Sequence, residues 1–183
     1  MKLYIPTLTE IAKYSRFDEI DVQRQRELID SAFAQHRKKL AGDYYETTKP
    51  SGIYIMGDYL ATAITLDLEG TVYVCKFAVH PNAQNGGHGT QLIEHMLGNI
   101  GIEPGNNRGI SIILRSDVAN GLTNLFYLGI FSERYLGSAH GAKSSNDAHK
   151  WIVHQIGLQG EDLERKIQLV ADLPITMVPF EQG

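Results

Sequence analysis

The chain has 183 residues, of which 43% are hydrophobic and 21% charged, and its formal net charge is -4. This length and balance are typical of one globular domain, so we expect a single domain over residues 1–183. The negative charge and the lack of a Lys- and Arg-rich run argue against a nucleic-acid-binding protein, and no apolar run reaches the roughly 20 residues of a membrane span.

The first residues and the cysteine content indicate the cellular compartment of the protein. The N-terminus, MKLYIPTLTE, carries charge and proline where a secretory signal needs an apolar stretch. Cys75 is the single cysteine, so it has no partner within the chain for a disulfide. We therefore expect a cytoplasmic protein in a reducing compartment.

The first half of the chain predicts one helix and a set of antiparallel strands. Apolar residues recur at helical spacing over residues 21–40, with Gln, Arg and Lys between them, and Asp21 is the expected N-cap. β-prone runs then alternate with the turn pairs Gly57-Asp58 and Glu69-Gly70. These runs predict strands over residues 53–56, 59–68 and 71–79.

The second half mixes the two kinds of element. After a glycine-rich segment, the periodicity predicts helices over residues 90–100, 120–128 and 161–171 and strands over residues 110–114, 131–136 and 151–156. The order of elements indicates an α/β (α+β) domain with a mixed, mostly antiparallel sheet flanked by helices.

The strongest functional signal is the loop between the strand at residues 71–79 and the helix that follows it. It reads Gln84-Asn85-Gly86-Gly87-His88-Gly89-Thr90. A strand that enters a glycine-rich turn and then a helix is a common phosphate-binding device, because the first helical N–H groups have no partner within the helix. A connecting loop without a ligand is the alternative.

Three ligand classes use this device, and the residues separate them. A nucleoside-triphosphate loop needs a Gly-Lys-Ser/Thr ending, and this loop has no lysine. A dinucleotide fold needs a third glycine where Leu92 stands. Gln84, Gly87 and Gly89 match the Gln/Arg-x-x-Gly-x-Gly/Ala pattern, and in this the loop resembles the coenzyme A loop of the GNAT acetyltransferases.

The resemblance implies a GNAT fold and acetyl-coenzyme A as cosubstrate. It implies that the cofactor is bound by the end of the preceding strand and by the loop, at Phe77, Ala78, Val79, Gln84, Asn85, Gly86, Gly87, His88, Gly89 and Thr90. It also implies that Asn120 approaches the cofactor and that Tyr127, seven residues on, protonates the departing coenzyme A thiolate. The alternative for Tyr127 is a buried aromatic residue with no part in the chemistry.

A wider resemblance covers about residues 19–157 and points to the acetyltransferase domain of the N-acetylglutamate synthases. It rests on Tyr59-Leu60-Ala61-Thr62-Ala63-Ile64, Lys76-Phe77-Ala78-Val79, Leu114-Arg115-Ser116 and Trp151-Ile152-Val153. By this resemblance Lys76, Arg115 and Asp117 are substrate-binding candidates, with the Phe77 backbone and Asn120 beside them. Two departures concern the acceptor: Cys75 replaces an Asp, and Asp117 replaces an Arg, which suits a cationic group better than a carboxylate.

The expected function is therefore an acetyl-coenzyme A-dependent N-acetyltransferase that acts on the amine of a small molecule or amino acid, with a glutamate-like acceptor included. The amine attacks the thioester directly in a ternary complex, and Asp117, His80 and Glu94 are candidates for the general base. The alternative is a coenzyme A-binding regulatory or assembly module that has lost its acceptor site. No metal is expected, because the seven histidines show no metal-ligand spacing. A homodimer is a common state of this fold, and no nucleic acid or membrane partner is expected.

Overall fold

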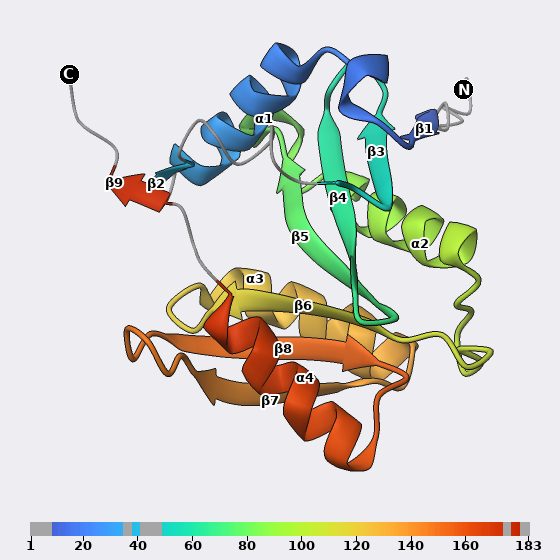
Figure 1. Cartoon of the computed structure of the whole chain (residues 1–183). Coiled ribbons are helices and arrows are strands. Elements are labelled where there is room, and N and C mark those ends of the chain that lie inside the picture. The colour runs from blue at the N-terminus through green and yellow to red at the C-terminus, as the bar shows by residue number, and fades with distance from the viewer. Residues whose placement is uncertain (1–8, 35–37, 41–48, 174–176, 180–183) are drawn as a thin grey trace.

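The computed structural model describes residues 9–34, 38–40, 49–173 and 177–179. Within them, seven strands form one sheet in the order β1-β3-β4-β5-β6-β8-β7 (Figure 1). The strands are β1 (Ile11–Tyr14), β3 (Gly52–Met56), β4 (Ala61–Leu68), β5 (Thr71–Val79), β6 (Ile112–Asp117), β7 (Ser138–Lys143) and β8 (Lys150–Ile156). Among these described strands, neighbours pair antiparallel, except that β5 and β6 are parallel. A separate antiparallel pair joins β2 (Lys38–Leu40) to β9 (Met177–Pro179).

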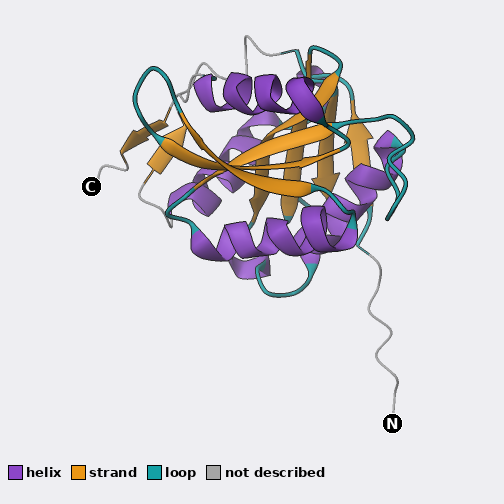
Figure 2. Cartoon of the chain, turned by 90° about the horizontal axis from the view of Figure 1, so that it is seen from below, coloured by secondary structure: helices purple, strands orange, loops and turns teal. Residues whose placement is uncertain are grey.

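Helices cover both faces of the sheet (Figure 2). They are α1 (Val22–Ala34), α2 (His88–Ile100), α3 (Gly121–Tyr127), which continues into the π-helical turn η4 (Leu128–Arg134), and α4 (Gly160–Asp172). Short 3-10 turns stand at Phe17–Glu19 and Pro81–Ala83. The two-residue period of the strands sends alternate side chains to opposite faces. Along β6, for example, Ile112 and Leu114 join the core under α2, whereas Ile113 joins the core under α4.

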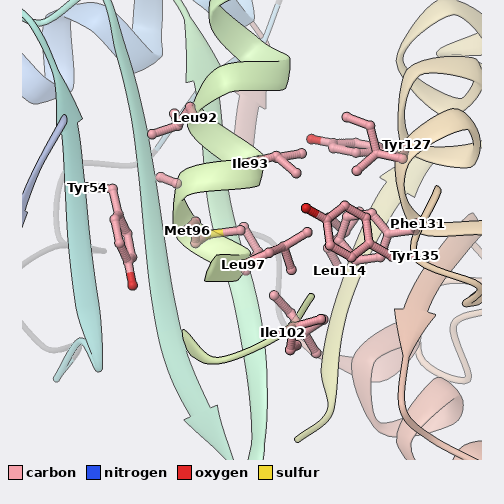
Figure 3. Packing of buried hydrophobic residues seen from close by; sticks show 14 of the residues in the cluster. Tyr54, Leu92, Ile93, Met96, Leu97, Ile102, Leu114, Tyr127, Phe131 and Tyr135 are labelled. Carbon is pink, nitrogen blue, oxygen red and sulfur yellow. The ribbon is translucent and has the colours of Figure 1, made fainter. Parts of the chain in front are cut away.

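The larger core lies between the sheet and α2, α3 and η4. Leu92, Ile93, Met96 and Leu97 recur along α2 at helical spacing and are fully buried. They meet Leu114 of β6 and the aromatic residues that follow β6 in the chain (Figure 3). On the opposite face, α1 packs over β3, β4 and the end of β5, and α4 packs over β6 and β8. The predicted α/β fold with a mostly antiparallel, helix-flanked sheet is thus confirmed.

The predicted strand over residues 131–136 is wrong. Residues 128–134 extend α3 as a π-helical turn, and the strand of this region is β7 at Ser138–Lys143. Phe131 and Tyr135 are four residues apart and both bury their rings in the core that α2 covers. Aromatic residues have a high propensity for strands, but here they occupy a helical segment because tertiary packing overrides local propensity. β7 was missed because SAHGAK is a half-exposed segment without apolar alternation.

The predicted helix over residues 21–40 is too long. It ends at Ala34, and residues 38–40 form β2, while residues 35–37 lie outside the described part of the chain. Its predicted N-cap is confirmed, because the Asp21 carboxylate accepts the Arg24 N–H at 3.1 Å. The short strands β1, β2 and β9 were not predicted. Of the helices that the structure describes, none combines the length and the apolar character needed to cross a bilayer.

Candidate functional site at the diverging strands

The site is built where the two parallel strands of the sheet separate. In the described structure β5 and β6 pair only at Val72 with Ile112 and at Tyr73 with Ile113. Beyond these residues each strand stays paired with its outer neighbour, β5 with β4 to Val79 and β6 with β8 to Asp117. The sheet therefore consists of two halves that are joined at one end, and Figure 1 shows β5 and β6 running apart from that junction. The facing edges no longer form a ladder with each other, which suits them to bind an extended ligand arm.

The glycine-rich loop leads from the end of β5 into α2. Asn85 and Gly87 adopt left-handed conformations with φ of 65° and 81°, so the chain turns sharply before the helix begins. Gly87 is the N-cap and contributes no side-chain cap. The first bond of the helix runs from the Gln91 N–H to the Gly87 carbonyl at 3.0 Å. The N–H groups at the start of α2 therefore precede the helical ladder and point outward, which is the arrangement that binds phosphate.

Main-chain and side-chain contacts hold this loop against the sheet. The Gln84 amide donates to the Val79 carbonyl at 3.2 Å, and the His80 N–H donates to the Leu60 carbonyl at 2.8 Å. Gly89 lies so close to Phe126 that a Cβ added to the glycine would stand 3.2 Å from the ring. The loop residues 84–87 are exposed, whereas residues 88–90 are half-buried. The predicted cofactor loop is thus anchored on the sheet with its backbone turned to solvent.

Tyr127 lies between the separated halves of the sheet. Its ring centroid is 6.0 Å from that of Phe77 on β5, and Phe126 packs beside both rings. In Figure 3 the Tyr127 hydroxyl points toward α2, on the side of Ile93. The residue is 6% exposed, and burial raises the pKa of its hydroxyl well above the usual value. The hydroxyl therefore stays protonated at neutral pH, as a proton donor must.

Asn120 has the structural role expected of the first residue of α3. Its side-chain oxygen accepts the Thr123 N–H at 3.3 Å, and its own N–H donates to the Asp117 carbonyl at 3.0 Å. These bonds hold the start of α3 on the end of β6. Because α3 is only seven residues long, they also fix the position of Tyr127 at its other end.

A histidine that was not predicted as a site residue supports Tyr127. His154 of β8 is 1% exposed, its ring centroid is 5.4 Å from that of Tyr127, and its Nε2 is 3.2 Å from the Asn124 side-chain oxygen. Burial lowers the pKa of His154 to about 4, so the ring is neutral at neutral pH. The tyrosine therefore packs against an uncharged ring.

The lowered pKa of His154 predicts acid sensitivity of the fold. The pKa of this histidine is about 4 in the folded chain and 6.5 in the unfolded chain. Between these two pH values the unfolded chain binds a proton here and the folded chain does not. The stability that is present above this pH range is therefore lost as the pH falls through it. We expect the free energy of unfolding in urea to fall by about 2 kcal/mol from this residue between about pH 7 and about pH 5. The variant His154→Gln, which keeps a donor for Asn124, should show a shallower fall. Equal slopes for both proteins would contradict this assignment.

Lys76, Arg115 and Asp117 lie on the other face of the sheet, under α1 and α4. A β-bulge produces this arrangement on β5: Lys76 pairs with Ile64 and Val74 with Thr65, which leaves Cys75 as the extra residue. Phe77 and Val74 pack under α2, whereas Cys75 packs with the cores of α1 and α4. Burial lowers the pKa of Lys76 to about 8, and the nearby charge of Arg115 acts in the same direction.

The two charged residues of β6 already have protein partners. The Arg115 guanidinium donates to the carbonyls of Val170 and of Leu173, the latter at 2.9 Å, and it stacks on the Trp151 ring at 4.5 Å. It thus holds the C-terminal end of α4. The Asp117 carboxylate is 3.0 Å from Nε2 of His149. The structure therefore separates two groups of predicted residues: the cofactor loop and Tyr127 on one face, and Lys76, Arg115 and Asp117 on the other.

Solved structures share this architecture. A protein from Bacteroides thetaiotaomicron that is assigned to the GNAT acetyltransferase family superposes with a TM-score of 0.60 at 15% identity, covering 90% of this chain and 99% of that one. The diaminobutyrate acetyltransferase of Paenibacillus lautus, in complex with L-2,4-diaminobutyric acid and coenzyme A, gives 0.56 at 14% identity, over 83% of this chain and 98% of that one. The chain has the GNAT acetyltransferase fold.

The resemblance to the glutamate synthases also has a structural counterpart. The N-acetylglutamate synthase of Neisseria gonorrhoeae, complexed with coenzyme A and N-acetyl-glutamate, superposes with a TM-score of 0.50 at 15% identity, over 80% of this chain and 35% of that one. No protein-family model and no curated protein sequence matches the chain. Among the described residues, no group of three or more His, Cys, Asp or Glu side chains is placed to hold a metal ion.

Proposed function

We propose that this protein is an acetyl-coenzyme A-dependent N-acetyltransferase that acts on the amine of a small molecule or amino acid. The observation that carries the proposal is the junction at which β5 and β6 diverge, with the start of α2, which has no side-chain cap, on one side and Tyr127 between Phe77 of β5 and His154 of β8. The N–H groups at the start of α2 suit the pyrophosphate of coenzyme A. The edge of β5 from Phe77 to Val79 suits its pantetheine arm, which brings the thioester beside Tyr127.

The chemistry follows from these positions. Backbone N–H groups near the bulge at Cys75 are suited to polarise the thioester carbonyl while the amine attacks it directly. Tyr127 donates its proton to the leaving thiolate, which avoids the release of a free anion. The acceptor approaches from the face that carries Lys76 and Asp117. The solved relatives that bind coenzyme A with an amino-acid ligand support this class of reaction, and a cytoplasmic location suits a chain with a single cysteine.

A second function has one observation in its favour. Arg115 is occupied by α4, and Asp117 stands where a carboxylate-bearing acceptor would need a cation. These partners disfavour a glutamate-specific site, and a coenzyme A-binding module without acceptor chemistry is the alternative. Free thiol released from acetyl-coenzyme A, measured across cationic, neutral and anionic amines with glutamate included, separates the two. Tight binding without turnover on any amine would favour the module.

Two glycines provide a matched test of coenzyme A binding. Gly87 in the loop and Gly70 in the β4–β5 turn have φ of 81° and 84°, and a Cβ added to either meets no atom within 4 Å. Replacing either by alanine should cost similar stability, about 1 kcal/mol, because both positions are left-handed. Only Gly87→Ala places a methyl group at the proposed phosphate position.

We expect Gly87→Ala to weaken acetyl-coenzyme A binding in calorimetry by about tenfold, equivalent to about 1.4 kcal/mol. Gly70→Ala should leave the dissociation constant unchanged, since this turn lies at the far end of β5. Equal affinities for the two variants would show that the loop does not bind the cofactor.

A further inference from the structure

A histidine–carboxylate pair stands at the end of β6, on the face opposite Tyr127. His149 Nε2 lies 3.0 Å from Asp117 Oδ2, and the two side chains are 34% and 25% exposed. Neither the glycine-rich loop nor Tyr127 uses this pair. Its members are 32 residues apart in the sequence, and they meet because β8 returns alongside β6 with Trp151 paired to Asp117.

Both members are held in a defined orientation. The second carboxylate oxygen of Asp117 accepts the Ala119 N–H at 2.9 Å, so the carboxylate cannot rotate freely. The centroid of the His149 ring lies 4.4 Å from that of the Trp151 ring, and the main-chain N–H of His149 donates to the Asp147 carboxylate at 3.0 Å. A carboxylate on Nε2 favours the tautomer with its proton on that nitrogen. Nδ1 is then the atom of the partly exposed ring that can take a proton.

The position of the pair relative to Tyr127 is fixed by a short chain of contacts. The Asn124 side chain donates to the Asp117 carbonyl at 2.9 Å, and its oxygen is 3.2 Å from His154 Nε2. The His154 ring in turn packs on Tyr127 at 5.4 Å. The histidine pair and the tyrosine thus lie on opposite faces of this half of the sheet, with Asp117 at the end of β6 and Tyr127 beside His154, which pairs with Leu114 of β6. The pair is therefore on the face from which the acceptor is proposed to approach, and Tyr127 is on the face of the proposed leaving thiol.

We propose that His149, positioned by Asp117, is the general base that takes the proton from the acceptor ammonium. The proposal rests on the proposed N-acetyltransferase function and deepens it. His149 removes the first proton and passes it to water, which frees the nitrogen lone pair for attack. The C–N bond then forms and the C–S bond breaks. The second proton then leaves the amide nitrogen for water. Tyr127 delivers its own proton to the thiolate and regains one from water, so each turnover releases one proton to solvent in total.

The charges around the pair favour a cationic acceptor. Asp117 faces His149 from β6, and Asp147 faces it from the turn before β8. Asp172 of α4 binds Ser145 of the same turn, and Arg115 lies across the Trp151 ring with its guanidinium committed to α4. The three carboxylates outnumber the one guanidinium, so the surroundings of the pair attract an ammonium group and repel an acceptor with a net negative charge.

The test is the pH dependence of kcat/KM for His149→Gln with a cationic amine that the wild-type protein acetylates. We expect a loss of about 100-fold near neutral pH. This loss should shrink toward about pH 9, because the free amine then needs less help from a base. Asp117→Asn should lose about tenfold, since it loosens the orientation of the histidine and removes one of the three nearby carboxylates but keeps the base itself. His140→Gln is the matched control: its Nε2 is bound to Ser138 in β7, and its activity should stay unchanged.

The affinity for acetyl-coenzyme A, measured by calorimetry, should be the same in all four proteins. A His149→Gln protein within about twofold of wild type across the whole pH range would overturn the proposal, as would a loss that is constant with pH, because base catalysis requires a pH-dependent loss. Both results leave the N-acetyltransferase function intact. A wild-type protein that acetylates no amine would overturn the function and the assignment of His149 together.

Discussion

Tyr127→Phe is expected to lower kcat by about 100- to 1,000-fold, the range of a lost general acid. The substitution removes one hydroxyl and keeps the ring that packs on Phe77 and His154. The thiolate must then leave without a proton, which raises the barrier of the chemical step while binding of acetyl-coenzyme A is unaffected. Because burial raises the pKa of Tyr127, the wild-type acid keeps its proton through the alkaline range of an assay. Single-turnover thiol release measures the step directly.

Tyr135 provides the control for this experiment. It belongs to the same buried cluster, is 7% exposed, and stands at the end of η4. Tyr135→Phe removes an equivalent hydroxyl from the same core and should leave kcat within about twofold of wild type, since it touches no group proposed to react. If both variants lose activity to the same extent, the loss reflects core packing and Tyr127 is not the acid.

Gly137→Ala is expected to destabilise the fold by about 3 kcal/mol or more, at the upper end of single substitutions. Gly137 lies between η4 and β7, and its N–H donates to the Phe131 carbonyl at 2.6 Å. A Cβ at this position would stand 1.9 Å from the Gln155 carbonyl oxygen and 2.8 Å from that of Phe131. Both are main-chain atoms, so the β7–β8 ladder or η4 must shift to admit a methyl group.

Gly141→Ala is the comparison, measured with Gly137→Ala by urea denaturation. Gly141 lies four residues further along β7, and a Cβ there meets no atom within 4 Å. We expect its free energy of unfolding to change by no more than about 0.5 kcal/mol. Similar losses for the two alanines would mean that β7 tolerates displacement. The support that β8 gives to Tyr127 through His154 would then be less rigid than the structure indicates.

Local signals in the sequence predicted the first half of the sheet and the cofactor loop. Turn pairs such as Glu69-Gly70 separate β-prone runs, and the φ values of 51° and 84° at these residues show why a glycine belongs there. The helical repeat of Leu92, Ile93, Met96 and Leu97 similarly predicted α2. In these segments, propensity, periodicity and burial all favour the same element.

Prediction from the sequence failed where contacts between distant parts of the chain determine the structure. Phe131 has a high strand propensity, yet it lies on a helical turn because its ring fills part of the core beneath α2. The bulge that places Cys75 and Lys76 on the same face arises from the pairing of β5 with β4. The sequence of β5 alone carries no signal for it. His149 and His154 reach the site from β8 and its preceding turn through contacts about 30 residues away in the chain. No motif at that spacing signals them.

We propose above that coenzyme A lies between the diverging strands with its pyrophosphate at the start of α2. An NMR titration of the labelled protein with coenzyme A tests this position directly, because backbone amides report the site of binding. We expect the largest shifts at Phe77 to Val79 and at Gly87 to Thr90, and unchanged signals at Gly70 and Gly141. Shifts confined to other parts of the chain, or no shifts at saturating coenzyme A, would contradict this position of the cofactor.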